Sequence, residues 1–411
     1  MNIKRLFKSK LLGNTFVYGL TNALYTGLPL LLLPFLVSTL DPEDYGDVEL
    51  FRSLTLVSIP LLGLSAVQAI GRFYYDLNDQ QFRTFVSSIQ IFQLFTTIAG
   101  IGIVFSFSFL LSQKDVTLLY LSCIYFLFNQ LTESLLTIYR VKEMPFRYLY
   151  IRVGTVLLEL FLMFLLYYTF SVHDWTLRVF PMVIGSVVVG VITFILFRVE
   201  KYRFVFSWSM LVQGLSYSTP LILHMLSGYL LNIGDRFLIK VFLTPEDLGN
   251  YAVAYQAGMA VNFFYTSFNL AWTPTFFKWM KEGKTLAIAK VRKIVYYSIV
   301  GLGLVVAILW YVVFPIIDVG DKYNVSSSVV LVVLISYMIL SLYKFETNYF
   351  LYNKETKRLS VYTMVSAGVS LILNFILIPI IGIFGAAIAT LVSFVCIYLL
   401  VLLNKKNDKI S

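Results

Sequence analysis

The sequence LDPEDYGD at Leu40–Asp47 returns half a chain later as LTPEDLGN at Leu243–Asn250. Each copy lies between two long apolar segments. A soluble protein would rarely place one loop twice in such a setting, whereas a membrane protein built from two equivalent halves repeats its loops. The repeat therefore predicts a chain of two similar halves.

Composition indicates a membrane protein before any motif is considered. Of the 411 residues, 59% are hydrophobic and 13% are charged, whereas a globular domain carries about 25% charged residues. A helix needs about 20 apolar residues to cross the hydrocarbon layer. The sequence predicts twelve such helices, at about 12–37, 47–70, 84–111, 116–139, 148–170, 177–197, 213–240, 249–276, 294–317, 325–351, 359–380 and 382–403.

The distribution of basic residues tests this count independently, because lysine and arginine favour cytoplasmic loops. Every second loop of the twelve-helix scheme is basic, and the intervening loops hold only Lys114, Arg178, Lys240 and Lys322. This alternation predicts an even number of helices and places both termini in the cytoplasm. The basic segments are 4–10, 72–83, 140–152, 198–203, 278–293, 354–358 and 405–409.

Several function classes are excluded at this stage. The net charge of +10 is spread over separate cytoplasmic segments, so we expect no nucleic-acid partner. Cys123 and Cys396 fall within predicted helices, and the two histidines belong to no cluster with metal-ligand spacing, so neither a disulfide framework nor a metal site is expected. The hydrophilic segments are too short for a catalytic domain. We therefore expect a transporter that is not an enzyme and carries no cofactor.

The repeat also sets the predicted organisation of the fold. We expect an all-α integral membrane protein with a six-helix bundle at 1–205 and a second at 206–411. An even number of helices leaves both halves in the same orientation, so their pseudo-two-fold axis lies along the membrane normal. The linker at 198–215 mixes bases with aromatic residues, which suits either a segment lying in the interface or an ordinary basic loop.

Seven motifs, taken in order, resemble a known family. They are Leu40–Gly46, Arg72–Asp76, Leu231–Phe237, Tyr251–Tyr255, Asn269–Pro274, Asn374–Pro379 and Gly382–Thr390. Their order resembles that in the polysaccharide-repeat (O-antigen type, Wzx-type) flippases of the multidrug/oligosaccharidyl-lipid/polysaccharide exporter superfamily. The resemblance covers both halves, although residues 100–210 carry no distinctive motif.

The resemblance implies a MATE-like fold in the cytoplasmic (inner) membrane. It also implies transfer of a polyprenyl-pyrophosphate-linked oligosaccharide from the inner to the outer leaflet for cell-surface polysaccharide synthesis. Membrane lipid, the polysaccharide polymerase and the chain-length machinery are the further partners that it implies. The two-half repeat favours alternating access as the mechanism.

A diphosphate within the membrane requires cations, and intramembrane ionisable residues are functional candidates because they are costly there. Arginine suits phosphate especially well, since its planar fork forms two parallel hydrogen bonds. Each arginine has a structural alternative: Arg72 and Arg152 could extend to the interface, Arg236 could brace Asp235, and Arg52 could pair with Glu49. The substrate-binding candidates are Arg52, Arg72, Arg152, Arg236 and Lys344, with Tyr255 and Trp272 added from the family-like motifs as sugar-stacking residues.

Four acidic residues are candidates for ion coupling: Glu133, Glu159, Asp235 and Glu346. Glu159 lies near the predicted midplane and has no cation three or four residues away. It therefore either faces water or is protonated. Lys344 and Glu346 are two residues apart and point to different faces of their helix, so they cannot form a local pair.

Three other classes were weighed against a flippase. A multidrug cation exporter of the same superfamily shares the expected fold, but it needs a mostly acidic cavity, and the intramembrane charges here are mixed. A major-facilitator transporter needs a characteristic loop after the second helix, where this chain has Gly71–Asp76 instead. A polymerase or glycosyltransferase generally needs a large outer loop, which this chain lacks.

Overall fold

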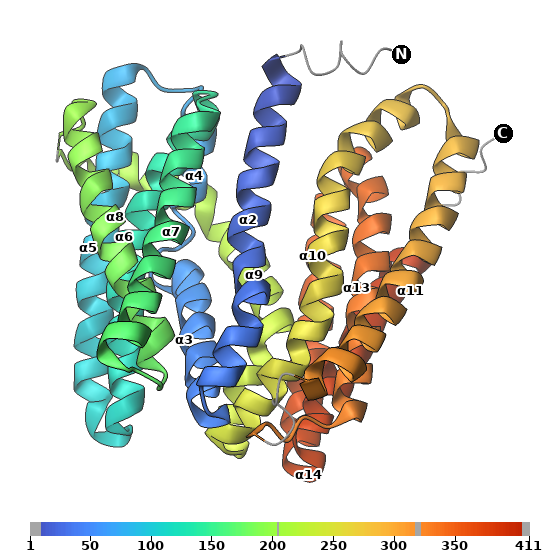
Figure 1. The fold of residues 1–411 in the computed structure, drawn as a ribbon. Helices are drawn as coiled ribbons and strands as arrows, with labels where there is room; N and C mark the ends of the chain where they lie inside the picture. The colour runs from blue at the N-terminus through green and yellow to red at the C-terminus, as the bar shows by residue number, and fades with distance from the viewer. Residues whose placement is uncertain (1–9, 204, 317–321, 405–411) are drawn as a thin grey trace. The chain divides into compact units, whose positions relative to one another are not determined.

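The computed structural model describes residues 10–203, 205–316 and 322–404, and within them the chain forms twelve α-helices and one short 3-10 helix (Figure 1). The helices are α2 (Lys10–Thr39), α3 (Pro42–Leu61), α4 (Val67–Phe73), α5 (Asp79–Phe107), η1 (Ser108–Leu110), α6 (Gln113–Val141), α7 (Pro145–Phe170), α8 (Thr176–Val199), α9 (Trp208–Phe242), α10 (Pro245–Lys281), α11 (Thr285–Ile316), α13 (Ser327–Tyr352) and α14 (Thr356–Asn404).

Each of the twelve predicted segments is mainly helical in the described residues, but the structure differs from the prediction at two places. The segment 47–70 is divided between α3 and α4. Leu64 and Ser65 adopt positive φ angles of 44° and 55° in the short connection. Residues other than glycine seldom adopt that backbone conformation, and a right-handed helix cannot continue through it. Pro60, just before the break, removes one backbone donor and favours an end to α3.

The last two predicted segments join in α14 instead of being separated by an open turn. The helix is kinked at Ile381 and Gly382, where Gly382 has φ 61° and ψ −146°. Only glycine adopts that region readily, so this residue type is required at the bend. Pro379 precedes it and frees a carbonyl group of the preceding turn.

Seven helical segments of the described chain are long and apolar enough to cross a membrane. The other long helices, α6, α9 and α10, carry more polar residues; in α10, for example, Asn250, Gln256 and Asn262 interrupt the apolar sequence. The seven segments are Val17–Thr39, Asp79–Leu110, Pro145–Phe170, Thr176–Val199, Thr285–Val312, Ser327–Tyr352 and Thr356–Asn404. The chain is therefore an all-helical membrane protein with several spans.

Contacts divide the chain into two compact units. Unit 1 consists of residues 1–25 and 50–226, and unit 2 of residues 26–49 and 227–411. In unit 1, α6, α7 and α8 pack against one another, and α6 also contacts α4 and α5. In unit 2, α13 packs against α10, α11 and α14.

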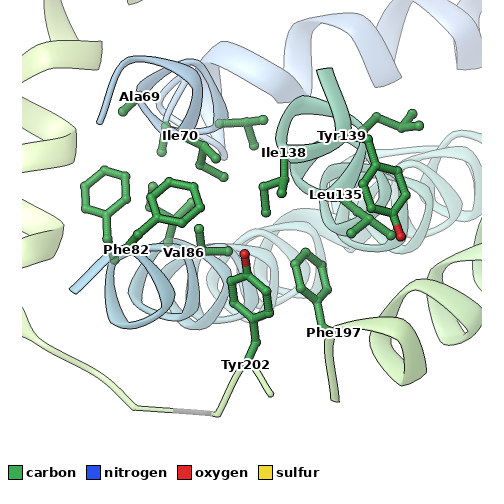
Figure 2. Packing of buried hydrophobic residues seen from close by; sticks show 14 of the residues in the cluster. Ala69, Ile70, Phe82, Val86, Leu135, Ile138, Tyr139, Phe197 and Tyr202 are labelled. Atoms are coloured by element: carbon green, nitrogen blue, oxygen red, sulfur yellow. The ribbon is translucent and has the colours of Figure 1, made fainter. Parts of the chain in front are cut away.

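Unit 1 has a buried aromatic and aliphatic cluster at one end of its helices (Figure 2). Ala69 and Ile70 of α4 face Phe82 and Val86 of α5, while α6 contributes residues such as Leu135. Because lipid tails are as apolar as these side chains, close van der Waals packing rather than burial from water holds such helices together in a membrane.

The linker after α8 is fastened to this cluster. Tyr202 is buried in it and packs on Phe197 with ring centroids 5.0 Å apart (Figure 2). Ser87 of α5 donates a hydrogen bond to the carbonyl oxygen of Arg203 at 2.6 Å, and the backbone N–H of Ser207 donates to Ser88 at 2.9 Å. Neither sequence interpretation of the linker included this attachment to α5.

Unit 2 has its own aromatic cluster, formed by α10, α11 and α13. Trp272 lies nearly parallel to Phe268 and Phe345, at interplanar angles of 15° and 11°. Tyr265 and Phe276 of α10 complete the α10 side of the cluster. It fixes the faces that α10 and α13 turn toward each other.

Candidate functional site

The first charged cluster lies inside unit 1, between α6 and α7. Arg152 pairs with Glu133 at 2.6 Å, and both side chains are largely buried. The guanidinium of Arg152 lies 4.4 Å from the ring centre of Tyr25 at the C-terminal end of the unit's first segment. Arg152 is therefore held by both a carboxylate and an aromatic face. An arginine that only extended its side chain to the membrane interface would need neither contact.

The second buried pair joins α7 to α8. Nη1 of Arg178 lies 3.0 Å from Oε2 of Glu159, and both side chains are buried. The assignment of Arg178 to an outer loop was wrong, because this residue lies in the first turn of α8. The two sequence alternatives for Glu159, facing water or being protonated, omitted this partner 19 residues along the chain.

A small polar cavity lies between the two pairs. Its free volume of about 10 Å³ is close to the space that one water molecule needs. In this conformation it has room for water or a small ion but not for a glycan. The cavity is lined by Tyr25, Tyr125, Asn129, Thr132, Arg152, Thr155, Glu159, Ser186 and Val189.

In unit 2, Arg236 of α9 is enclosed by acidic and aromatic partners. Its Nη1 lies 2.9 Å from Oδ1 of Asp235, and its Nε lies 3.8 Å from Glu49 of α3. Its guanidinium carbon lies 4.1 Å from the ring centre of Tyr255, and Tyr251 donates a hydrogen bond to Asp235 at 2.6 Å. This geometry fits the structural interpretation of Asp235 and Arg236 as a bracing pair.

Lys344 of α13 has a different environment. Its Nζ donates a hydrogen bond to Oδ1 of Asn262 on α10 at 2.6 Å. Among the described residues it forms no ion pair with a carboxylate, whereas Arg152, Arg178 and Arg236 all do. Its positive charge is therefore not neutralised within the described part of unit 2.

Glu346 turns away from Lys344, as the two-residue spacing predicts. It accepts a hydrogen bond from the Tyr296 hydroxyl at 2.6 Å and pairs with Arg292 of α11 at 2.7 Å. Tyr296 also lies 3.1 Å from the hydroxyl of Tyr398 on α14. This network ties α11, α13 and α14 together.

The remaining candidates take other positions. Arg72 is exposed and pairs with Asp76 at 2.5 Å, four residues further along the chain. Arg52 is half-buried in α3. Trp272 and Tyr255 are buried, Trp272 in its aromatic cluster and Tyr255 beside Arg236, so neither ring presents a free face for stacking on a sugar in this conformation.

Sequence reasoning missed the amide side chains near Lys344. Asn262 and Asn269 stand seven residues apart on α10, and Asn348 stands four residues after Lys344 on α13. Seven and four residues are helical spacings that place side chains on one face. The spacing was present in the sequence, but the asparagines carry no charge that would mark them as intramembrane candidates.

No metal site is evident in the described ranges, where no group of three or more His, Cys, Asp or Glu side chains is arranged to hold an ion.

The fold and the paired intramembrane charges define a multi-pass, all-helical membrane protein. The chain belongs to the polysaccharide biosynthesis protein family, whose model matches residues 11–280. It is 26% identical over 347 residues to the Lsg locus protein 1 of Haemophilus influenzae, covering 82% of this chain and 84% of that protein.

Two solved structures share the fold. The lipid II flippase MurJ in an inward closed conformation has a TM-score of 0.75 at 14% identity, covering 95% of this chain and 88% of that chain. An inward-facing multidrug resistance MATE family transporter of the MOP superfamily has a TM-score of 0.66 at 16% identity, covering 93% and 96%. The family description gives a role in polysaccharide biosynthesis, and the two solved structures show that the chain has the MurJ-like and MATE-like fold.

Proposed function

We propose that this protein is a flippase that moves a polyprenyl-pyrophosphate-linked oligosaccharide repeat unit from the inner to the outer leaflet of the cytoplasmic membrane. The family supports a role in polysaccharide biosynthesis. The likeness of its fold to a lipid II flippase supports a lipid-linked cargo. The glycan would then enter O-antigen, capsule or exopolysaccharide synthesis.

The observation that carries the proposal is the environment of Lys344. A half-buried lysine without a carboxylate partner is costly in a membrane, and a diphosphate would offset that cost. A multidrug exporter for cations, the alternative function, would gain nothing from this charge, because it would repel the cargo.

The proposed topology has twelve spans in two six-helix halves, 1–205 and 206–411, related by a two-fold axis along the membrane normal. Both termini lie in the cytoplasm. The alternation of basic loops supports this arrangement. Cargo would move by alternating access. Cargo binding would favour the intermediate or outward-open state of the protein over the inward-open state.

The paired arginines have a second role in this proposal. Arg152 and Arg236 are neutralised in this conformation, by Glu133 in one case and by Asp235 and Glu49 in the other. Protonation of the carboxylate would release the arginine for phosphate. Glu133, Asp235, Glu159 and Glu346 therefore stay candidates for ion coupling.

The test replaces Lys344 in cells that lack their own flippase, with surface glycan as the readout. Lys344→Arg keeps the charge and should retain most export, while Lys344→Ala should reduce export at least tenfold at an equal protein level in the membrane. Lys293→Ala, which removes an exposed lysine at the start of α11, is the matched control and should export normally. Normal export by Lys344→Ala would contradict the proposal. If the protein made cells resistant to cationic drugs, the multidrug exporter would be favoured instead.

A further inference from the structure

Around Lys344 the hydrogen bonds fix the orientation of three amide side chains. Asn348 is fully buried, and its Nδ2 lies 3.2 Å from the carbonyl oxygen of Phe345. A backbone carbonyl can only accept, so this end of the amide must be the NH₂ group. The oxygen at the other end accepts a hydrogen bond from Thr273 at 2.8 Å.

This orientation passes from Asn348 to Asn269. The NH₂ group of Asn348 also donates to the Asn269 side chain at 2.9 Å, so Asn269 must present its Oδ1 there. The hydroxyl of Tyr265 donates to the same Oδ1 at 3.2 Å. The Nδ2 of Asn269 consequently points away from its amide partner, and no described residue accepts a hydrogen bond from it.

Asn262 is oriented by Lys344 in the same way. An ammonium group only donates, so the atom 2.6 Å from Lys344 Nζ is the oxygen of Asn262. The Nδ2 of Asn262 has no acceptor among the described residues, and Lys344 keeps further N–H groups beyond the one that it uses here. Asn262, Asn269 and Lys344 are all half-buried rather than enclosed.

On this face of α10 and α13, Asn262 and Asn269 each have an unused NH₂ group, and Lys344 adds further donors. Asn262 and Asn269 are two helical turns apart, about 10 Å along the axis, with the positive charge at the Asn262 end. A cationic drug would be repelled by the positive charge of Lys344. A diphosphate followed by a sugar is rich in acceptor oxygens and carries its negative charge at one end.

We propose that Lys344, Asn262 and Asn269 form the cargo's diphosphate–sugar subsite, with the diphosphate at Lys344 and Asn262 and acceptor oxygens of the first sugar at Asn269. Asn262 is the positioning residue for Lys344, and Asn348 is the positioning residue for Asn269. This inference rests on the proposed function and deepens it.

The diphosphate end is tested by binding of geranylgeranyl pyrophosphate to the purified full-length protein in nanodiscs, with geranylgeraniol as the uncharged comparison. Asn262→Asp places a carboxylate beside Lys344 while keeping the size and shape of the side chain at position 262. This variant should weaken geranylgeranyl pyrophosphate binding at least tenfold. Asn262→Ala leaves the charge in place and should weaken binding less. Asn353→Asp makes the same charge change at the exposed end of α13 and should bind as the parent does.

The sugar end is tested separately by glycan export, because geranylgeranyl pyrophosphate has no sugar. Asn269→Asp and Asn269→Ser should reduce export at least fivefold while geranylgeranyl pyrophosphate binding by Asn269→Ser stays within twofold of the parent. A variant is compared with the parent only if its unfolding temperature without ligand matches that of the parent. If Asn269→Asp does not fold, Asn269→Ser alone tests the sugar end.

The outcomes separate this subsite from the proposed function. Loss of binding with Lys344→Ala but normal binding with Asn262→Asp would overturn the subsite and leave the flippase proposal intact. Binding by Asn262→Ala equal to that of the parent would overturn the positioning role of Asn262. Failure of the parent protein to prefer geranylgeranyl pyrophosphate over geranylgeraniol would contradict the flippase proposal itself.

Discussion

Gly46 and Gly249 occupy equivalent positions in the two copies of the repeated stretch, and each lies against the backbone of the other copy. A Cβ atom on Gly46 would overlap the carbonyl oxygen of Pro245, and one on Gly249 would overlap that of Pro42. Pro42 and Pro245 are themselves equivalent, and each begins a helix, α3 and α10. The contact is therefore reciprocal, as a two-fold relationship between the copies requires.

Gly46→Ala and Gly249→Ala should each destabilise the protein, because the obstructing atoms belong to the backbone and cannot rotate aside. Overpacking of this kind costs about 1–3 kcal/mol. Gly368→Ala is the control, since a Cβ there meets no heavy atom within 4 Å and alanine favours a helix. Thermal unfolding in detergent measures the difference. If both repeat variants were as stable as the parent, the first turns of α3 and α10 would be able to move apart at little cost in stability.

The first copy of the repeat is also held by the segment before α13. Lys322 pairs with Asp41 at 3.0 Å, and the hydroxyl of Tyr323 donates to the carbonyl oxygen of Leu40 at 2.9 Å. In a variant without Cys123 and Cys396, cysteines at Asp41 and Lys322 should be joined by a short bifunctional methanethiosulfonate reagent, whose spacer replaces the length of the lost side chains and which reduction removes.

If these segments part during transport, the cross-linked protein should export less glycan than the same protein after reduction. The single variants Asp41→Cys and Lys322→Cys control for loss of the ion pair. Full export by the cross-linked form would exclude an opening movement at this contact.

The repeated stretch also tests the proposed topology. Glu43 and Glu246 are equivalent and exposed, so cysteine at either position should react with a membrane-impermeant thiol reagent added outside intact cells or spheroplasts. Glu282→Cys, in the proposed cytoplasmic loop after α10, should react only after the membrane is opened. Labelling of just one repeat position from outside would mean that the two halves do not share an orientation.

Much of the helical fold follows from the length of the apolar segments, because the bilayer imposes this requirement on the sequence directly. The breaks were harder to predict. The division of α3 from α4 depends on the backbone at Leu64 and Ser65, and neither residue type signals a positive φ angle. At Gly382 the sequence predicted the start of a separate helix, but it could not show that the bend is a local kink within one continuous run of helix.

The site could be predicted only as a set of ionisable residues with two aromatic residues from the family-like motifs. Lys344 and Glu346 could be separated because helix geometry fixes residues two apart. The partner of Glu159 could not be found, because Arg178 lies on another helix and contact between helices is not encoded in local spacing. The orientation of Asn269 depends on a chain of hydrogen bonds from the backbone of α13, which only coordinates reveal.

The buried pair of Glu159 and Arg178 provides the last prediction. Glu159→Gln leaves the guanidinium of Arg178 buried without its counter-charge, which costs about 3–5 kcal/mol in a buried pair. Removing both charges, as in Glu159→Gln with Arg178→Met, should restore most of that stability. Asp76→Asn breaks the exposed pair with Arg72 and should leave the unfolding temperature close to that of the parent, because solvent screens exposed ion pairs. Thermal unfolding ranks the three variants, and glycan export then gives the role of the pair.

A double variant that is stable but does not export would mark Glu159 as an ion-coupling residue, whereas normal export would make the pair structural. If Glu159→Gln alone is as stable as the parent, the carboxylate does not compensate Arg178, and this account of the pair is wrong.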